Sequence, residues 1–255
     1  MAWYEEFFGE DYVRFHLRGG EWLEERTVSQ CDFVVSALKI QPPARVLDLC
    51  CGQGRASVEL ARRGFRVSGL DLSEYLLGLA QQRADKCGVQ VEFVRRDMRD
   101  IPWENEFDAV VNLFTSFGYL ETDEEDQRVL LAACKALRPS GRLLIDHHNR
   151  ERTSAMFGGG RKDWYEHDDH LILDSHDWDV LRSRMSMTRT IIAPDGSRRE
   201  TGFLLRIYSH SEIMAMLEKA GLEWQHSYGG YDGSDYAHDS RGTIVVARRP
   251  EEASQ

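Results

Sequence analysis

The segment 44–64 constrains the fold of this chain more than any other stretch of its sequence. It begins with the apolar run Val46–Leu49, which has the length and composition of a buried strand. The run breaks at Gly52 and Gly54 and continues into a stretch with the apolar spacing of a helix. Glycine lets the backbone approach a ligand closely, and the start of a helix presents unpaired N–H groups. The segment therefore predicts a strand, a glycine turn and a helix that cradle a nucleotide.

Two more predicted strands follow, and each leads into an acidic residue. The first, 65–70, ends at Asp71, which follows Asp48 by 23 residues. This spacing fits one strand-helix-strand unit, and an acid at the tip of the second strand can accept hydrogen bonds from both ribose hydroxyls. The next strand, 89–94, leads into Asp97, where the edge of an adenine would lie. The three acids therefore predict a ligand that contains adenosine.

This order of motifs resembles that of the class I S-adenosylmethionine-dependent methyltransferases. The first motif of that family reads roughly hydrophobic-x-Asp-x-Gly-x-Gly-x-Gly, and the stretch 46–54 matches it except that Cys50 replaces the first glycine. The similarity covers residues 45–145 well and the C-terminal strands more loosely. It implies S-adenosyl-L-methionine as the cofactor and S-adenosyl-L-homocysteine as the product.

The resemblance also implies which residues bind the cofactor. Asp48 and the glycine turn would hold the methionine half, Asp71 the ribose, and Asp97 with the backbone of Met98 the adenine. Residues at the end of the fourth predicted strand would touch the methionine end. The full set of expected cofactor-binding residues is Asp48, Cys51, Gly52, Gly54, Asp71, Leu72, Asp97, Met98, Asn112, Leu113 and Phe114.

A nicotinamide dinucleotide fold is the alternative interpretation of the same glycines. Its G-x-G-x-x-G pattern wraps a pyrophosphate at a helix N-terminus, but the sixth position of that pattern is Ser57 here. Asp48 lies inside the strand, where a carboxylate is poorly placed beside a pyrophosphate and suits a positively charged amino-acid moiety. A glycine turn that binds nothing would explain neither Asp71 nor Asp97. We therefore favour the methyltransferase interpretation.

Strands and helices alternate along the chain, which is typical of an α/β fold with a doubly wound, mostly parallel sheet. By resemblance, this sheet has seven strands, and the last strand is antiparallel. We expect an N-terminal helical lid over 1–40, a cofactor-binding core over 41–152, an antiparallel β insertion after strand five over 153–208, and a C-terminal helix and β-hairpin over 209–250.

Composition narrows the choice of partners. The 255 residues include 32 Lys and Arg against 43 Asp and Glu, which gives a net charge of −11. Because proteins that grip a nucleic acid usually present a cationic surface, we expect a small-molecule acceptor and no nucleic acid. No apolar run approaches the roughly 18 residues of a membrane span, the five cysteines form no Cys-x-x-Cys pair, and the start lacks a signal-peptide profile. These features predict a cytoplasmic protein.

Aromatic residues are concentrated near the start of the chain. Tyr4, Phe8, Tyr12 and Phe15 recur at helical spacing and predict one aromatic stripe. Such a stripe usually packs on the domain, but methyltransferases of this kind commonly use the segment before the first motif as a lid. Aromatic faces attract a sulfonium or a protonated amine, so Tyr4 and Tyr12 are candidates for binding the substrate.

Two strand ends carry further candidates. The fourth predicted strand leads into Phe117 and Tyr119, which by resemblance face the acceptor, and the fifth leads into His147 and His148. A histidine there can accept a proton from a nucleophile, or it can be a hydrogen-bonded wall of the pocket. Our candidates are His147 and Tyr119 for catalysis, and Phe117 and His148 for substrate binding.

The pattern changes in the predicted insertion. The runs 171–173, 180–192 and 200–208 predict antiparallel strands that make an acceptor cover or pair two chains as a homodimer. Acidic residues and histidines between 163 and 177 invite a metal hypothesis, but no recognised ligand spacing stands out, so we expect no metal.

These observations predict an enzyme that methylates a small-molecule amine or hydroxyl. The acidic charge and the aromatic lid slightly favour nitrogen. A hydroxyl acceptor would need a base such as His147, whereas an amine needs only to lose its proton before attack. The main alternative is a methyltransferase that acts on RNA or protein, followed by an NAD(P)-dependent oxidoreductase and a non-catalytic S-adenosylmethionine binder.

Overall fold

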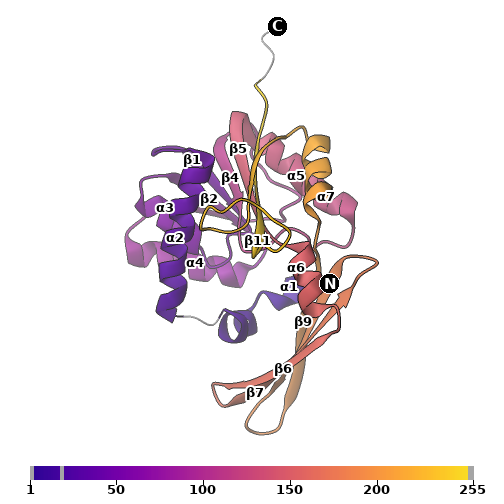
Figure 1. Ribbon diagram of the computed structural model, residues 1–255. Coiled ribbons are helices and arrows are strands. Elements are labelled where there is room, and N and C mark those ends of the chain that lie inside the picture. Colours follow the sequence, from indigo (N-terminus) through magenta and orange to yellow (C-terminus); the bar gives the residue numbers. More distant parts are fainter. Residues whose placement is uncertain (1–2, 18–19, 252–255) are drawn as a thin grey trace.

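The computed structural model describes residues 3–17 and 20–251 and has a seven-stranded sheet at its centre (Figure 1). The strands of this sheet are β1 (Arg45–Leu49), β2 (Arg66–Asp71), β3 (Glu92–Arg95), β4 (Phe107–Asn112), β5 (Leu137–His148), β10 (Glu223–Tyr228) and β11 (Gly242–Arg248). Their order across the sheet is β10-β11-β5-β4-β1-β2-β3. The first five strands run parallel, and β11 is antiparallel to both of its neighbours. The predicted doubly wound sheet with an antiparallel last strand is confirmed.

Helices cover both faces of the sheet. They are α2 (Gly20–Leu38), α3 (Arg55–Arg62), α4 (Glu74–Cys87), α5 (Asp123–Ala136) and α7 (His210–Lys219). Successive side chains of a strand point to opposite faces, so Val46 packs in the core beneath α2 and α3 while Leu47 packs in the core beneath α5 and α7. Burial on both faces explains why the central strands read as continuous apolar runs. No helix within the described ranges is both long enough and apolar enough to span a bilayer.

The ends of the helices follow signals in the sequence. Ser73 accepts a hydrogen bond from the backbone N–H of Leu76 and so caps α4, which ends at Gly88 with a φ of 66°. Ser209 and Glu212 form a capping box at the start of α7. Caps of this kind typically stabilise a helix by about 1 kcal/mol.

A second, smaller sheet extends from one end of the core (Figure 1). Helix α6 (Arg150–Phe157) leads into the antiparallel strands β6 (Arg161–His167), β7 (His170–Asp179), β8 (Arg184–Ile192) and β9 (Arg198–Arg206). The sequence predicted three strands, but the acidic stretch around Trp164 forms a fourth, which pairs antiparallel with β7. Residues 180–183 form a turn, so the prediction of a strand there is wrong.

The N-terminal segment is not one continuous helix. It consists of α1 (Trp3–Phe7) and the π-helix η1 (Tyr12–His16), with a bend at 8–9. Gly9 in the middle of the segment weakens a helix, which explains the break. Phe15 turns away from the other aromatic residues and packs in a small core with Ile172 and Ile191 of the second sheet. The prediction of a single stripe through Phe15 is therefore wrong.

Candidate active site

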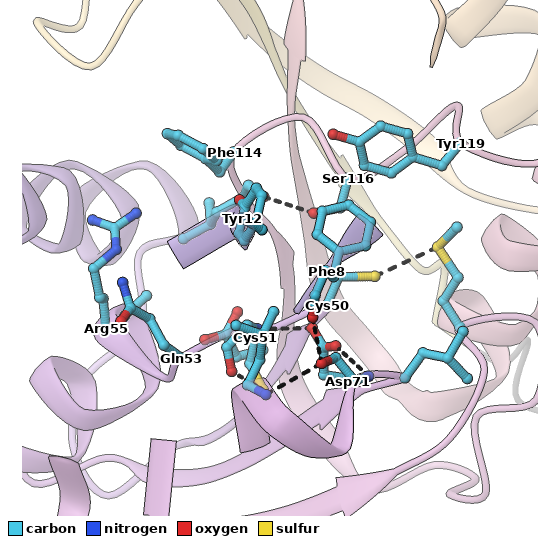
Figure 2. A pocket seen from close by; sticks show the side chains of 18 of the residues that line it. Phe8, Tyr12, Cys50, Cys51, Gln53, Arg55, Asp71, Phe114, Ser116 and Tyr119 are labelled. Carbon is cyan, nitrogen blue, oxygen red and sulfur yellow. Dashed lines mark hydrogen bonds between the residues drawn. The ribbon is translucent and has the colours of Figure 1, made fainter. Parts of the chain in front are cut away.

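A cavity lies at the carboxyl ends of β1, β2 and β4, between this edge of the sheet and the N-terminal segment (Figure 2). Its volume is about 1190 Å³, including the open mouth. The order in which strands are added to the sheet reverses at β1, because β2 and β3 lie on one side of β1 and β4 and β5 lie on the other. In open α/β sheets this switch point is where ligands bind. The fold therefore places the cavity where a functional site is expected.

The glycine turn after β1 forms part of the cavity lining. Gly52 has a φ of +55°, and a Cβ added there would meet no heavy atom closer than 4.0 Å. A side chain at Gly52 would strain the backbone and project into open space. Gly54 is different, because an added Cβ would lie 2.8 Å from the Cβ of Ala80. Gly52 thus keeps the cavity clear, whereas Gly54 lets α3 pack closely on α4.

Asp71 ends β2 and lies against the glycine turn (Figure 2). Its Oδ2 accepts a hydrogen bond from the N–H of Gly52 at 2.8 Å, and its Oδ1 accepts one from the N–H of Ser73 at 2.9 Å. Burial raises the pKa of Asp71, although both hydrogen bonds oppose the rise. Each carboxylate oxygen has a second acceptor site. Asp71 can therefore accept hydrogen bonds from two hydroxyls of a ribose.

Asp48 is buried at the end of β1 and lines the same cavity. Its Oδ2 accepts a hydrogen bond from the hydroxyl of Ser57 at 2.5 Å. Burial raises the pKa of Asp48 to about 6, and the nearby carboxylate of Asp71 adds to the rise. Above that pH the cavity holds two buried negative charges. A positively charged ligand group would relieve their repulsion.

Asp97 and Met98, which follow β3, line the far end of the cavity. The guanidinium of Arg99 donates two hydrogen bonds to the carboxylate of Asp97, from Nε to Oδ1 at 2.9 Å and from Nη2 to Oδ2 at 2.6 Å. Burial of Asp97 opposes its ionisation, but the bonds from Arg99 outweigh burial and lower its pKa. The hydroxyl of Tyr4 lies 3.4 Å from the same guanidinium. The N-terminal segment is thereby joined to this end of the cavity.

Arg55 is a cavity residue that the sequence did not lead us to expect. Its Nη1 donates a hydrogen bond to Oγ1 of Thr27 at 2.6 Å, and its guanidinium lies 5.6 Å from the centre of the Phe114 ring. Burial lowers its pKa. Among the side chains that the structure describes, those of residues 3–17 and 24–251, no carboxylate lies at salt-bridge distance from Arg55. A cation in the first turn of a helix opposes the helix dipole, and that signal could have drawn attention to this residue.

The wall opposite Asp71 is aromatic and uncharged (Figure 2). Ring centres lie 4.9 Å apart for Phe8 and Tyr12 and 5.5 Å apart for Phe8 and Tyr119. The hydroxyl of Ser73 donates to the carbonyl oxygen of Phe8 at 2.7 Å, which ties this wall to the start of α4. Burial raises the pKa of Tyr12 and of Tyr119, so both hydroxyls keep their protons at neutral pH.

Most of the residues predicted at the site come together in this cavity. They are Tyr4, Tyr12, Asp48, Cys51, Gly52, Asp71, Leu72, Asp97, Met98, Leu113, Phe114 and Tyr119. Further lining residues that sequence reasoning missed are Phe8, Leu17, Thr27, Gln30, Gln53, Arg55, Arg96, Ser116 and Leu120. Five predicted residues are not among the lining residues, namely Gly54, Asn112, Phe117, His147 and His148.

Asn112 and Phe117 lie behind the cavity lining. The Nδ2 of Asn112 donates a hydrogen bond to the carbonyl oxygen of Leu49 at 3.0 Å and so joins β4 to β1. Phe117 is 1% exposed, and its ring centre lies 5.4 Å from that of Tyr208. Both residues support the wall, which corrects the expectation that they line the cavity.

The two histidines at the end of β5 also lie outside the cavity. His147 is fully buried, and its Nε2 accepts a hydrogen bond from the backbone N–H of Tyr208 at 3.0 Å. Burial lowers the pKa of His147 to about 3, so the ring is neutral at physiological pH and its Nε2 lone pair is already used. His148 is exposed. Neither position suits a base that faces an acceptor, which corrects the expectation for His147.

Cys50 occupies the position of the missing first glycine. Its φ is 63°, a left-handed conformation that costs a residue other than glycine about 1 kcal/mol or more. Its thiol lines the cavity and lies 3.5 Å from the sulfur of Met98. Within the described part of the chain, no group of three or more His, Cys, Asp or Glu side chains could hold a metal ion.

Comparisons with known proteins agree with this geometry. Residues 46–141 match a family model described as a methyltransferase domain. A putative methyltransferase, YqeM of Bacillus subtilis, is 39% identical over 114 residues, which cover 44% of this chain and 46% of that protein. The cypemycin N-terminal methyltransferase of a Streptomyces species is 29% identical over 80% of this chain and 82% of its own length. The chain thus spans about half the length of the first curated relatives that it matches.

A solved structure extends the likeness to the whole fold. The S-adenosylmethionine-bound structure of CalS10, an amino pentose methyltransferase from Micromonospora echinaspora, superposes with a TM-score of 0.67 at 26% identity. The match covers 90% of this chain and 92% of that one. Residues 46–141 are therefore a methyltransferase domain, and the fold around them is similar to that of the S-adenosylmethionine-dependent methyltransferases.

Proposed function

We propose that the protein transfers a methyl group from S-adenosyl-L-methionine to the nitrogen of a small-molecule amine. One observation carries the proposal. Asp97, Asp71, the Gly52 turn and Phe114 lie at the carboxyl ends of β3, β2, β1 and β4. These strands are neighbours in the sheet in that order, and all four elements of the row line one cavity. With strands about 4.8 Å apart, the row is roughly 14 Å long. An adenosine with an amino-acid tail fits such a row.

The lining offers a partner for each part of the cofactor. Asp97 and the backbone of Met98 would bind the adenine, and Asp71 would accept hydrogen bonds from the ribose. The bare turn at Gly52 leaves room for the methionine tail. Asp48 would balance the ammonium group of this tail, and Arg55, which has no carboxylate partner among the described side chains, would bind its carboxylate. The donors and acceptors therefore fit this cofactor.

The acceptor side of the cavity favours an amine. The cofactor supplies a methyl group on a sulfonium, so the protein must align the nucleophile at about 3–3.5 Å and exclude water. Phe8, Tyr12 and Tyr119 provide an aromatic wall that does both and attracts a cation. The described lining contains no histidine, lysine or glutamate, and its three aspartates are those assigned above to the cofactor. An amine that has lost its proton to solvent needs no base, whereas a hydroxyl acceptor would need one.

The names of two relatives agree with nitrogen as the acceptor atom. The cypemycin enzyme is named for an N-terminus, and CalS10 for an amino pentose. The Phe203 ring of β9 lies 6.4 Å from that of Tyr119 and 6.5 Å from that of Trp3, which supports a role for the second sheet as an acceptor cover. Pairing of two chains through this sheet and a cytoplasmic location stay predictions.

The function is tested in two steps. Calorimetry should detect binding of S-adenosylhomocysteine. The protein is then incubated with labelled S-adenosylmethionine and separate pools of amines, phenols, carboxylic acids, peptides and RNA, and mass spectrometry identifies the methylated product. We expect a product in the amine pool. Failure to bind S-adenosylhomocysteine would refute the cofactor assignment, and labelling confined to another pool would refute the amine.

A further inference from the structure

The loop after β4 contains two residues in an unusual backbone conformation. Phe114 has a φ of 61° and Thr115 one of 58°, so both are left-handed. This conformation is disfavoured for residues other than glycine and is an outlier for a β-branched residue such as threonine. It persists only where surrounding contacts enforce it, and such sites cluster at ligand-binding surfaces. Because Phe114 lines the cavity, the contacts that enforce this turn also set the cavity wall.

Asp146, near the end of β5, holds the turn from behind. Its Oδ2 accepts a hydrogen bond from the N–H of Phe114 at 3.0 Å. Its backbone carbonyl oxygen accepts one from the N–H of Thr115 at 3.1 Å. A single residue therefore satisfies both backbone donors of the left-handed pair.

Tyr231, in the loop between β10 and β11, completes this arrangement. Its hydroxyl donates a hydrogen bond to the same Oδ2 of Asp146 at 2.7 Å, although the two residues are 85 positions apart. Its ring packs edge-on against Phe33 of α2, with ring centres 5.4 Å apart. Packing fixes the ring, so the hydroxyl is held at Asp146 and the carboxylate is held at the turn.

We propose that Tyr231 and Asp146 are positioning residues that fix the Phe114–Thr115 turn and thereby the wall beside the methionine end of the cofactor. This inference rests on the proposed function, because it requires the methionine end to lie beside β4. The Phe114 ring also lies 5.6 Å from the guanidinium of Arg55. A displaced turn would therefore disturb both the wall and the arginine that faces the cofactor's carboxylate.

Tyr231 and Asp146 together form a clamp on the Phe114–Thr115 turn. The charged groups around Asp146 make this clamp depend on pH. Burial raises the pKa of Asp146, whereas the hydroxyl of Tyr231, the N–H of Phe114, and the side chains of His148 and Arg26 lower it. Loss of the Tyr231 hydroxyl removes one of these opposing contributions, so the pKa of Asp146 rises further. In Tyr231→Phe the carboxylate then takes up a proton at a higher pH than in the unaltered protein.

Calorimetry with two ligands tests the clamp. S-adenosylhomocysteine has the amino-acid tail, and 5′-methylthioadenosine lacks it. We expect Tyr231→Phe to weaken S-adenosylhomocysteine about three- to tenfold, to leave methylthioadenosine within about twofold, and to move the acid limb of S-adenosylhomocysteine binding to higher pH. Tyr236→Phe is the matched control, because Tyr236 lies in the same loop and its hydroxyl donates to Glu151 outside the cavity.

The outcomes separate this inference from the proposed function. If the unaltered protein does not bind S-adenosylhomocysteine, the proposed function fails. If it binds, two results would refute the clamp. In the first, Tyr231→Phe binds each ligand as tightly as the unaltered protein does. In the second, its affinity for both ligands falls by the same factor and the pH profile does not change. Asp146→Asn provides a second test should Tyr231→Phe fail to fold, and the same selective loss of S-adenosylhomocysteine is expected.

Discussion

One end of the cavity is built from a single continuous segment of the chain, and the other end is built from several segments that are far apart in the sequence. The end at β1, β2 and β3 comes from one continuous stretch, 48–98, and its binding groups are carboxylates and a bare glycine turn. The end beside β4 comes from segments far apart in the sequence, which include the N-terminal aromatic residues, the 113–120 loop, and Asp146 with Tyr231 behind it. Its lining is mostly aromatic.

This difference follows from what each end must recognise. An adenosine with a charged tail demands fixed hydrogen-bond partners, and one strand-helix-strand repeat supplies them at neighbouring strand tips. An acceptor demands a shaped wall, which loops and insertions can supply in many ways on one scaffold. We therefore expect substitutions at the first end to act through cofactor affinity with large effects, and substitutions behind the second end to act weakly and indirectly.

The largest effect is expected at the ribose position. Asp71→Ala removes an ionised acceptor of two hydroxyls, and bonds to charged groups typically contribute about 1.5–3 kcal/mol. Calorimetry should show a loss of S-adenosylhomocysteine affinity of about 100-fold with the fold intact by circular dichroism. The exposed Asp100→Ala, at a carboxylate that pairs only loosely with Arg128, is the control. Unchanged affinity in Asp71→Ala would remove the ribose assignment.

Arg55 is expected to have the next largest effect. Arg55→Gln removes the cation proposed to face the methionine carboxylate, so S-adenosylhomocysteine should bind about tenfold more weakly. Methylthioadenosine, which has no carboxylate, should bind within about twofold of the unaltered protein. Arg62→Gln on the exposed side of the same helix should change neither affinity. An equal loss for both ligands would show that Arg55 supports the fold and does not bind the carboxylate.

The pH dependence of S-adenosylhomocysteine affinity tests the role of Asp48 at the first end of the cavity. Its pKa is raised to about 6 by burial, so the carboxyl is ionised at pH 7 and protonated at pH 5. Only the ionised form balances the ammonium group of the cofactor. S-adenosylhomocysteine affinity should therefore fall about tenfold between pH 7 and pH 5, and in Asp48→Asn it should be low and nearly flat over that range. A steep acid limb that persists in Asp48→Asn would assign the titration to another group.

The same contrast separates what the sequence could predict from what it could not. Asp48, Asp71 and Asp97 could be predicted from the sequence because each ends or follows an apolar run. The fold brings the ends of these runs together at one edge of the sheet. The break at Gly9, the departure of Phe15 to the second sheet, and the burial of His147 depend on packing between distant segments. The place of Arg55 in the first turn of a helix could be read from the sequence, but its lack of a carboxylate partner among the described side chains depends on the folded arrangement.

The smallest effect on catalysis is expected at His147, where the sequence alone suggested a base. The buried ring stays neutral down to a pH of about 3, whereas in the unfolded chain it takes up a proton below about 6.5. Stability that depends on the neutral ring is therefore present above pH 6.5 and declines as the pH falls toward 3.

His147→Gln keeps an acceptor for the N–H of Tyr208 but cannot titrate. We expect it to lower the free energy of unfolding by about 1–3 kcal/mol at pH 7 and to lose the acid-dependent decline. Its rate of methyl transfer between pH 6 and 9 should stay within about twofold of the unaltered protein with the same profile. A profile that loses its acid limb in His147→Gln would mean that a proton reaches this ring from the acceptor, and the contrast between the two ends of the cavity would then have to be abandoned.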